Sequence, residues 1–265
     1  MSEPPAIPPL TWLYVPADRP DRVEKAIASR AHAVIVDLED GVAPAAKAEA
    51  RSNLPALLRR GRDKPLFVRV NAGSADDLVA VATLEISGVY VPKVARPEDV
   101  PSLDLPVHCL VESAAGLEAA YAIATTPGVA GISLGEADLH AETGATEAGL
   151  DWARSRIVNA VVAAGLPRPA QSVYPHVRDL EGLARSCVRG RELGHLGRAA
   201  IHPDQLEPIE QAYLPTESEL ERAHEQLAQG PGATALADGS FVDAAIVRSA
   251  SQLIALAERY GTRPE

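Results

Sequence analysis

Cysteine, aromatic residues, positive charge and long apolar runs are all scarce in this 265-residue sequence. The two cysteines, Cys109 and Cys187, lack the spacing of a metal site, and Cys109 lies in an apolar run that predicts a buried thiol. Lysine and arginine total 25 against 36 aspartates and glutamates, so the formal net charge is −11. This excess of acid argues against a nucleic-acid or anionic-membrane surface. No apolar run reaches the roughly 18 residues that span a bilayer, so no membrane segment is predicted.

The first ten residues, MSEPPAIPPL, contain neither the basic segment nor the apolar segment of a secretory signal. We therefore predict a soluble, cytoplasmic protein. A hydrophobic content of 46% with 23% charged residues is ordinary for a globular protein. The length suits one large α/β domain, or such a domain with an appendage.

Short β-like runs alternate with amphipathic helical segments along most of the chain. Several of the runs are almost continuously apolar, which is typical of parallel strands covered on both faces. Eight such runs predict a TIM-like (β/α)8 barrel, with a doubly wound open sheet as the alternative, because strand order cannot be read from sequence. The predicted strands are 11–16, 33–38, 66–71, 88–93, 107–112, 130–135, 171–175 and 198–203.

The pattern changes after the eighth predicted strand. A polar helix is expected over 216–229, a flexible link over 230–240 and a strongly periodic helix over 241–260. We therefore predict a catalytic barrel domain over residues 1–215 and a C-terminal helical extension, or lid, over residues 216–265.

Carboxylates recur at the carboxyl ends of the predicted strands, where barrel enzymes carry their chemistry. Acids gathered at one end would repel one another and lose hydration, at a cost of several kcal/mol for each unpaired ion. A divalent cation relieves that repulsion. Hard oxygen ligands without a Cys/His set indicate Mg2+, with Mn2+ as the alternative. The polar residues at these ends are Asp18, Arg19, Asp37, Glu39, Asp40, Arg69, Asn71, Lys93, Glu112, Glu136, Asp138, Tyr174 and His202.

Glu112 and Asp138 are the best-placed pair of metal ligands. They lie 26 residues apart (112 to 138), which is one strand–helix unit, at or just after the ends of the fifth and sixth strands. Neighbouring strands are about 4.8 Å apart, so two such carboxylates can meet on one ion. Structural alternatives remain open: Asp138 capping a helix that begins at Leu139, or Glu112 accepting backbone N–H groups at a helix start.

Three further residues have both a functional and a structural interpretation. Arg69 can hold a substrate carboxylate or a developing oxyanion, or form a structural ion pair. Lys93 can supply a Schiff-base amine, or a salt bridge to the acidic residues. Asp243 can act chemically, or complete a capping box that Ser240 opens at the start of the last helix.

An ordered set of motifs runs nearly from end to end of the chain. Together these motifs resemble the citrate lyase beta-subunit-like (CitE-like) proteins of the HpcH/HpaI aldolase superfamily. The matching segments are LYVPADRPDRVEKA (13–26), VIVDLEDGVAPAAKAEAR (34–51), FVRVNA (67–72), GVYVPKV (88–94), LVESAAGL (110–117), SLGEADLHAETG (133–144), VYPHVRDLEGL (173–183) and AAIHPDQLEPIEQAYLPT (199–216).

The resemblance implies a TIM-like barrel that assembles as a homotrimer. It implies that Glu112 and Asp138 hold Mg2+, and that Gly135, in the motif of Asp138, lies at the substrate. It gives Arg69 the substrate carbonyl and carboxylate. It places Asp37 and Glu39 near the metal through its waters, with Asp37 counted among the catalytic residues.

Two positions far from these motifs also gain roles from the resemblance. Arg19 lies where relatives approach the phosphates of coenzyme A, and Asp243 matches an acid/base that closes over a neighbouring subunit's site. Two departures concern the substrate pocket: Glu136 stands one position away from a frequent acid, and Gln171 stands where an aspartate is frequent.

The expected activity is therefore a Mg2+-dependent carbon–carbon lyase acting on a malyl-, citramalyl- or citryl-type β-hydroxyacyl-CoA. Its products would be acetyl-CoA and a 2-keto acid, with coenzyme A present as part of the substrate. Two alternatives remain open. One is a class II pyruvate-type aldolase acting on free hydroxy-keto acids, and the other is a citrate lyase beta subunit acting on an acyl-carrier-protein thioester within a complex.

Overall fold

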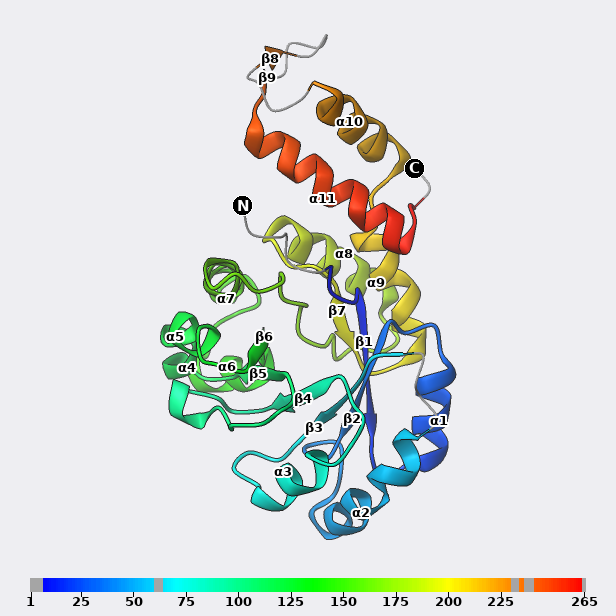
Figure 1. Ribbon diagram of the computed structural model, residues 1–265, viewed down its shortest axis with the longest axis vertical. Coiled ribbons are helices and arrows are strands. Elements are labelled where there is room, and N and C mark those ends of the chain that lie inside the picture. Colours follow the sequence, from blue (N-terminus) through cyan, green and yellow to red (C-terminus); the bar gives the residue numbers. More distant parts are fainter. Residues whose placement is uncertain (1–6, 60–63, 230–233, 236–240, 264–265) are drawn as a thin grey trace. The chain divides into compact units, whose positions relative to one another are not determined.

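The computed structural model describes residues 7–59, 64–229, 234–235 and 241–263 and contains a curled sheet of seven parallel strands (Figure 1). The strands lie in the order β6-β5-β4-β3-β2-β1-β7, so β1 to β6 follow the chain from neighbour to neighbour. Their bounds are β1 (Thr11–Pro16), β2 (Ala33–Asp37), β3 (Leu66–Arg69), β4 (Gly88–Val91), β5 (Val107–Val111), β6 (Val129–Leu134) and β7 (Arg198–Ala200).

The apolar composition of the strands reflects their burial on both faces. All five residues of β2 and all four residues of β4 are buried, as expected of parallel strands that have helices outside and a packed interior. The first six predicted strands are confirmed to within two residues at each end, and the eighth predicted strand, 198–203, is present as β7 but is shorter than predicted.

The predicted strand at 171–175 is wrong in extent, because its only ladder contact is an isolated parallel bridge between Gln171 and Arg198. Gln171 donates its N–H to Gly197 O at 2.9 Å and accepts the N–H of Ala199 at 3.0 Å. On the other side Ser172 uses its side chain, donating Oγ–H to Leu134 O at the end of β6. Prolines at 167, 169 and 175 offer no N–H, which limits a regular ladder here.

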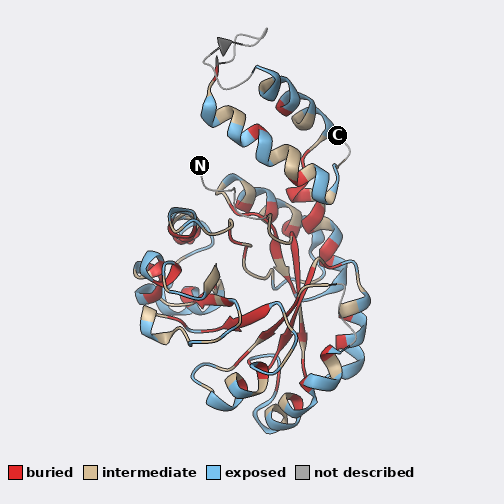
Figure 2. Ribbon diagram, in the orientation of Figure 1, coloured by how far each residue is buried: buried red, intermediate tan, exposed pale blue. Residues whose placement is uncertain are grey.

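Helices follow most of the strands, and their apolar faces are buried while their outer faces are exposed (Figure 2). In α1 Pro20 lies in the first turn, and Val23 and Ala26 are buried. The N-termini of α3 and α8 are capped by Ser74 and Asp179. The helices are α1 (Pro20–Ala28), α2 (Lys47–Leu58), α3 (Ala75–Val81), α4 (Ala114–Glu118), α5 (Ala120–Ala124), α6 (Glu136–Thr143), α7 (Asp151–Ala163) and α8 (Leu180–Glu192).

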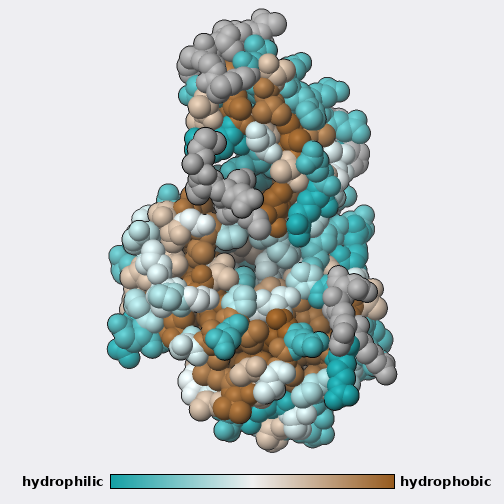
Figure 3. Space-filling model, in the orientation of Figure 1, coloured by the Kyte–Doolittle hydropathy of each residue, from teal (hydrophilic) through white to brown (hydrophobic). Residues whose placement is uncertain are grey.

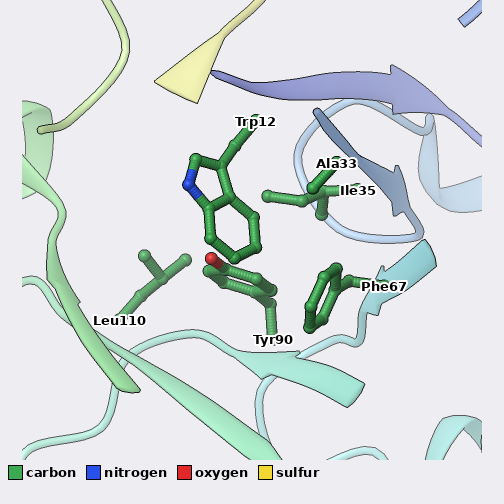
Figure 4. Close-up of a cluster of buried hydrophobic side chains, with 6 residues drawn as sticks. All are labelled: Trp12, Ala33, Ile35, Phe67, Tyr90 and Leu110. Atoms are coloured by element: carbon green, nitrogen blue, oxygen red, sulfur yellow. The ribbon is translucent and has the colours of Figure 1, made fainter. Parts of the chain in front are cut away.

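Aromatic side chains fill the interior of the curled sheet, although the sequence has few of them. Figure 4 shows Trp12, Phe67 and Tyr90 packed together with Ala33, Ile35 and Leu110. The rings of Trp12 and Phe67 are 5.1 Å apart, and His108 stacks on Tyr90 at 5.0 Å. Burial lowers the pKa of His108 to about 4, so it is neutral at pH 7. The interior is therefore a packed floor beneath the carboxyl ends of the strands.

The chain divides into two compact units, Met1–Glu210 and Gln211–Glu265, where the sequence places the division between 215 and 216. The remaining elements are α9 (Leu206–Tyr213), α10 (Glu217–Ala228), β8 (Thr234–Ala235), β9 (Phe241–Val242) and α11 (Ala244–Tyr260). Thr216 and Glu219 form a capping box at the start of α10, which packs against α11. Most of the predicted link, residues 230–233 and 236–240, lies outside the described residues.

Hydrophobic residues gather over the strands of the first unit on the face shown in Figure 3. Within the described part of the chain, every helix is too short or too polar to cross a membrane.

Candidate active site

Arg69 and Asp37 form a two-bond ion pair at the carboxyl ends of β3 and β2. The parallel register sets Asp37 directly beside Arg69. Nε and Nη2 of Arg69 each donate to one Asp37 oxygen at 2.7 Å. This parallel pair of charge-assisted bonds fixes the plane of the guanidinium. The structural ion pair considered from the sequence is confirmed.

Both oxygens of Asp37 have further donors. Oδ1 accepts the N–H of Glu39 at 2.9 Å, and Oδ2 accepts the N–H of Gly41 at 2.8 Å. A Cβ at Gly41 would lie 2.6 Å from Oδ2, so the turn can approach the carboxylate this closely only with glycine. Asp37 therefore orients Arg69 and the turn after β2, and its four acceptor directions are occupied.

Glu39 is a buried carboxylate whose two oxygens contact cations but lack well-aligned hydrogen-bond donors among the described residues. Its Oε2 lies 2.9 Å from Nη1 of Arg69, and its Oε1 lies 3.4 Å from Nζ of Lys93. These are charge contacts with poor hydrogen-bond geometry, because neither oxygen has a regular hydrogen-bond donor within the described part of the chain. Burial raises the pKa of Glu39 against the lowering effect of Arg69, and exposed Asp40 raises it further.

Glu112, just after β5, receives one backbone donor from the neighbouring strand. The N–H of Lys93 donates to its Oε2 at 3.0 Å. Lys93 has a φ of 57°, the one positive φ among the described residues other than glycine. The helix-start interpretation of Glu112 is therefore wrong. Burial, followed by the charge of Glu39, raises the pKa of Glu112 to about 7.

Gly135 allows Glu112 to lie directly against the backbone that begins α6. A Cβ at Gly135 would stand 2.3 Å from Cγ and 2.6 Å from Oε1 of Glu112. Asp138 lies three residues further on, in the first turn of α6, and it is exposed. Its charge contributes to the raised pKa of Glu112, so the two carboxylates lie within electrostatic reach. The helix begins at Glu136 after Gly135, so Asp138 is not its N-cap and that interpretation is wrong.

Replacing Gly135 with alanine is expected to move the Glu112 carboxylate, since contacts of 2.3–2.6 Å cannot be relieved by small shifts. We expect about 1–3 kcal/mol of destabilisation from overpacking and a Mg2+ affinity lower by on the order of tenfold. Chemical denaturation and calorimetric titration with MgCl2 measure the two effects. Gly149→Ala is the control for a methyl group added away from Glu112, and its Cβ would meet the backbone of Thr146 at 3.3 Å. Unchanged stability and Mg2+ affinity in Gly135→Ala would contradict this geometry.

The side chains at the two departures from the family pattern, Glu136 and Gln171, bond to residues other than Glu112. Glu136 is bound by the buried guanidinium of Arg154 in α7, with Nε donating to Oε1 at 3.1 Å. Gln171 accepts from Nη1 of Arg198 at 3.2 Å and donates to Ser186 O in α8. These side chains join the sheet to its outer helices, so neither contributes its polar atoms to the cluster around Arg69.

Arg19 and Asp243 are not brought to this cluster by any described contact. Arg19 is exposed at the start of α1, and its one described ion pair is with Asp18 at 3.9 Å. Asp243 belongs to the second unit, where its Oδ1 accepts the N–H groups of Ala245 and Ile246 at 2.9 and 3.0 Å. The predicted capping box is therefore wrong: Asp243 is itself the N-cap of α11.

Tyr14 is the site residue that the sequence analysis missed. Its ring lies 5.0 Å from Cζ of Arg69, within cation–π range. The charges of Arg69, Asp37, Glu112 and Glu39 all act on its hydroxyl, although burial is the main reason that its pKa is raised. The alternation of Trp12 and Tyr14 with Leu13 in β1 could have revealed it as an inward-facing residue.

The charges at this end of the sheet suit a divalent cation. Where the structure describes the chain, no three His, Cys, Asp or Glu side chains form a ready-made metal cage. Magnesium nevertheless needs only one or two protein carboxylates, with substrate and water completing its shell. Burial is the main reason that the pKa of Glu39 and that of Glu112 are raised, and a nearby carboxylate raises each further, Asp40 for Glu39 and Glu39 for Glu112. The acids are Asp37, Glu39, Asp40, Glu112 and Asp138, and the cations are Arg69 and Lys93.

The chain belongs to the HpcH/HpaI aldolase/citrate lyase family, whose model matches residues 10–106 and 102–203. It is 34% identical over 272 residues to a (3S)-malyl-CoA thioesterase of Cereibacter sphaeroides strain KD131, covering 93% of both chains. It is 30% identical over 309 residues to an L-malyl-CoA/beta-methylmalyl-CoA lyase of C. sphaeroides strain ATCC 17029, covering 96% of both.

Among solved structures, the chain is similar to the protein CitE of Mycobacterium tuberculosis in complex with magnesium, acetoacetate and coenzyme A. The TM-score is 0.79 at 34% identity, and the match covers 96% of this chain and 99% of that one. The expected family is thereby confirmed, and so is an α/β fold with a curled parallel sheet, which is consistent with the expected TIM-like barrel.

Proposed function

We propose that this chain is a Mg2+-dependent carbon–carbon lyase that cleaves or forms a malyl-, citramalyl- or citryl-type β-hydroxyacyl-CoA. The products of cleavage are acetyl-CoA and a 2-keto acid. The observation that carries the proposal is that the buried carboxylate of Glu39 and the half-buried carboxylate of Glu112 lie near Arg69, with the pKa of Glu112 raised and with no regular hydrogen-bond donor to Glu39 among the described residues. The chain that holds them is similar to a malyl-CoA lyase and to a CitE protein bound to magnesium and coenzyme A.

Glu112 and Asp138 would hold the metal, which when bound polarises a hydroxyl or keto oxygen of the substrate. Glu112 offers Oε1 for this purpose, because its Oε2 accepts the N–H of Lys93. Glu39 lies deeper and would act through metal-bound water, whereas Asp37 is a positioning residue whose oxygens are already occupied.

Arg69 would bind the substrate carboxylate and stabilise the negative charge that develops as the carbon–carbon bond breaks. Its guanidinium has five N–H groups, and Asp37 takes two of them. The Nη1 group, which meets Glu39 in poor hydrogen-bond geometry, retains donors for a ligand. Because Asp37 fixes the guanidinium before substrate arrives, little reorganisation is required during reaction.

The remaining roles follow the family resemblance. Arg19 would approach the phosphates of coenzyme A. Asp243 would act as acid/base at the site of a neighbouring copy in a homotrimer. Residues 1–215 would form a (β/α)8 barrel, in which segment 171–172 takes the place of a strand between β6 and β7. Residues 216–265 would form the lid. We place the protein in the cytoplasm.

Mass spectrometry of reaction mixtures tests the proposed activity. The purified chain, MgCl2 and acetyl- or propionyl-CoA are incubated with glyoxylate, pyruvate or oxaloacetate. We expect a new β-hydroxyacyl-CoA for at least one pair, and its loss when EDTA replaces MgCl2. If none of the combinations gives a new thioester, and none of the product thioesters is cleaved, the proposal is wrong. Turnover of hydroxy-keto acids without thioester would instead favour the class II aldolase, and turnover only of acyl-carrier-protein thioesters would favour the citrate lyase subunit.

Hydrolysis is a second candidate, because one relative is a (3S)-malyl-CoA thioesterase. The same reaction mixtures distinguish it. A thioesterase releases free coenzyme A and the free hydroxy acid, whereas a lyase working in the cleavage direction releases acetyl-CoA and the keto acid. Incubation with malyl-CoA in H2(18)O would place the label in a carboxylate oxygen of released malate only if the thioester is hydrolysed.

A further inference from the structure

We infer that the Tyr14 hydroxyl is a substrate-contacting hydrogen-bond donor that acts together with Arg69 on the carboxylate end of the 2-keto acid. This inference rests on the proposed function and deepens it, since it concerns how the same site selects the keto acid.

The position of Tyr14 follows from the register of β1. Tyr14 stands beside Ile35 of β2, and two residues later Pro16 stands beside Asp37. Since alternate residues of a strand face the same side, Tyr14 lies one inward layer below the level of Asp37. It packs against the aromatic floor drawn in Figure 4, and its ring is 6.4 Å from that of Tyr90. Tyr14 therefore joins the apolar floor to the charged residues above it.

The contacts of Tyr14 leave its hydroxyl available to a ligand. The ring has two described contacts, with Arg69 at 5.0 Å and with Tyr90. Within the part of the chain that the structure describes, the hydroxyl has no hydrogen bond to protein. It is also absent from the buried unpartnered side-chain atoms there, so it reaches accessible space. A tyrosine hydroxyl at the edge of a core normally has a hydrogen-bond partner. The absence of a protein partner for the Tyr14 hydroxyl, among the described residues, therefore indicates that it donates to a ligand.

The surroundings of the hydroxyl define the ligand that it can meet. The guanidinium of Arg69 lies 5.0 Å from the ring that carries it, and the charges of Arg69, Asp37, Glu112 and Glu39 all act on it. Burial raises its pKa, so it stays a neutral donor at any working pH. A ligand oxygen that binds the available N–H groups of Arg69 would therefore lie near a second donor, the Tyr14 hydroxyl. A carboxylate has enough lone pairs to accept from both.

Two such donors would distinguish a 2-oxo carboxylate from an aldehyde or ketone that lacks the acid group. Removing one donor to a charged acceptor costs about 1.5–3 kcal/mol, which is roughly 10- to 100-fold in binding. The coenzyme A part of the substrate is not expected to depend on Tyr14, because the resemblance assigns its phosphates to the segment around Arg19.

Tyr14→Phe tests the inference, because it removes the oxygen and keeps the ring over Arg69. We expect kcat/KM for the keto acid to fall by about 10- to 100-fold, with the KM for acyl-CoA and the Mg2+ affinity unchanged. Thermal unfolding should be unaffected, since no cavity forms. Tyr121→Phe, which removes a hydroxyl from an exposed residue of α5, is the matched control and should leave all values unchanged.

Calorimetric binding of pyruvate in the presence of MgCl2 keeps this test independent of turnover. If the wild-type chain binds pyruvate but makes no thioester, the proposed lyase activity fails while the Tyr14 inference is still tested by the affinity of Tyr14→Phe. An affinity and a keto-acid kcat/KM within twofold of wild type in Tyr14→Phe would overturn the inference, as would a wild-type chain that binds none of pyruvate, glyoxylate and oxaloacetate in the same titration. An equal rise in the KM for acyl-CoA and for keto acid would also overturn it, because it would indicate a general structural effect.

Discussion

Replacing Glu112 with glutamine is expected to abolish Mg2+-dependent turnover and to lower Mg2+ affinity by at least about 100-fold, while making the metal-free protein more stable at neutral pH. The loss follows from removing a charged oxygen that the metal needs, and exceeds the roughly 10- to 100-fold effect of altering a residue that only supports a ligand. Calorimetric titration with MgCl2 and steady-state assays measure the loss.

The gain in stability follows from the pKa of Glu112, which is about 7 in the folded chain against an ordinary value of 4.5. The folded state binds that proton more tightly than the unfolded chain, so the metal-free wild type should lose stability as pH rises from about 4.5 through 7. Glutamine carries no titrating proton and should flatten this part of the profile. Thermal unfolding in EDTA at several pH values measures it.

Asp138→Asn should also abolish Mg2+-dependent turnover, but with little change in stability, because Asp138 is exposed. Glu118→Gln, which removes one charge from an exposed position of α4, is the control for net charge. Either site variant retaining wild-type activity at the same Mg2+ concentration would refute the assignment of the ligands.

Replacing Arg69 with leucine is expected to destabilise the protein by about 3–5 kcal/mol, because it leaves buried carboxylates without their main cation. Asp37 and Glu39 are 3% and 4% exposed, and Arg69 contacts both. Turnover should also be lost, since the substrate carboxylate loses its principal donor. Urea denaturation gives the free energy of unfolding, and the assay is run under conditions in which the variant remains folded.

Arg69→Lys separates the two roles of the guanidinium. A lysine restores one positive charge but not two parallel bonds to Asp37, so it should recover part of the stability and little of the activity. Arg96→Leu is the control, because that arginine is exposed and pairs with Asp99 at the surface, where an ion pair contributes about 0–1 kcal/mol. Arg69→Leu with a stability within about 1 kcal/mol of wild type would mean that the buried carboxylates are compensated by other groups.

The sequence determined where most strands lie along the chain, but not their order in the sheet. Strands buried on both faces consist of nearly continuous apolar residues, so β1, β2 and β4 could be placed from their composition alone. The acids after those strands were predicted to gather because parallel strands end at the same edge. The ordered motifs identified the family, and hence the residues to which a metal and a substrate carboxylate are assigned.

Only the tertiary structure decided which hydrogen-bond and charge partners each of those carboxylates has. Asp37 and Glu39 are separated by one residue, yet one has four donors and the other has no regular donor within the described chain, because Arg69 of the neighbouring strand donates two well-aligned N–H groups to Asp37 and none to Glu39. The hydrogen bond from the Lys93 N–H to Glu112, and the close approach of Gly135 to Glu112, likewise join residues that follow neighbouring strands. Segment 171–172 has a strand-like composition but contacts β6 through a serine side chain. Local composition reports whether a residue is buried, but the partners of a buried polar group are supplied by segments distant in sequence, and those partners set its charge state and its chemistry.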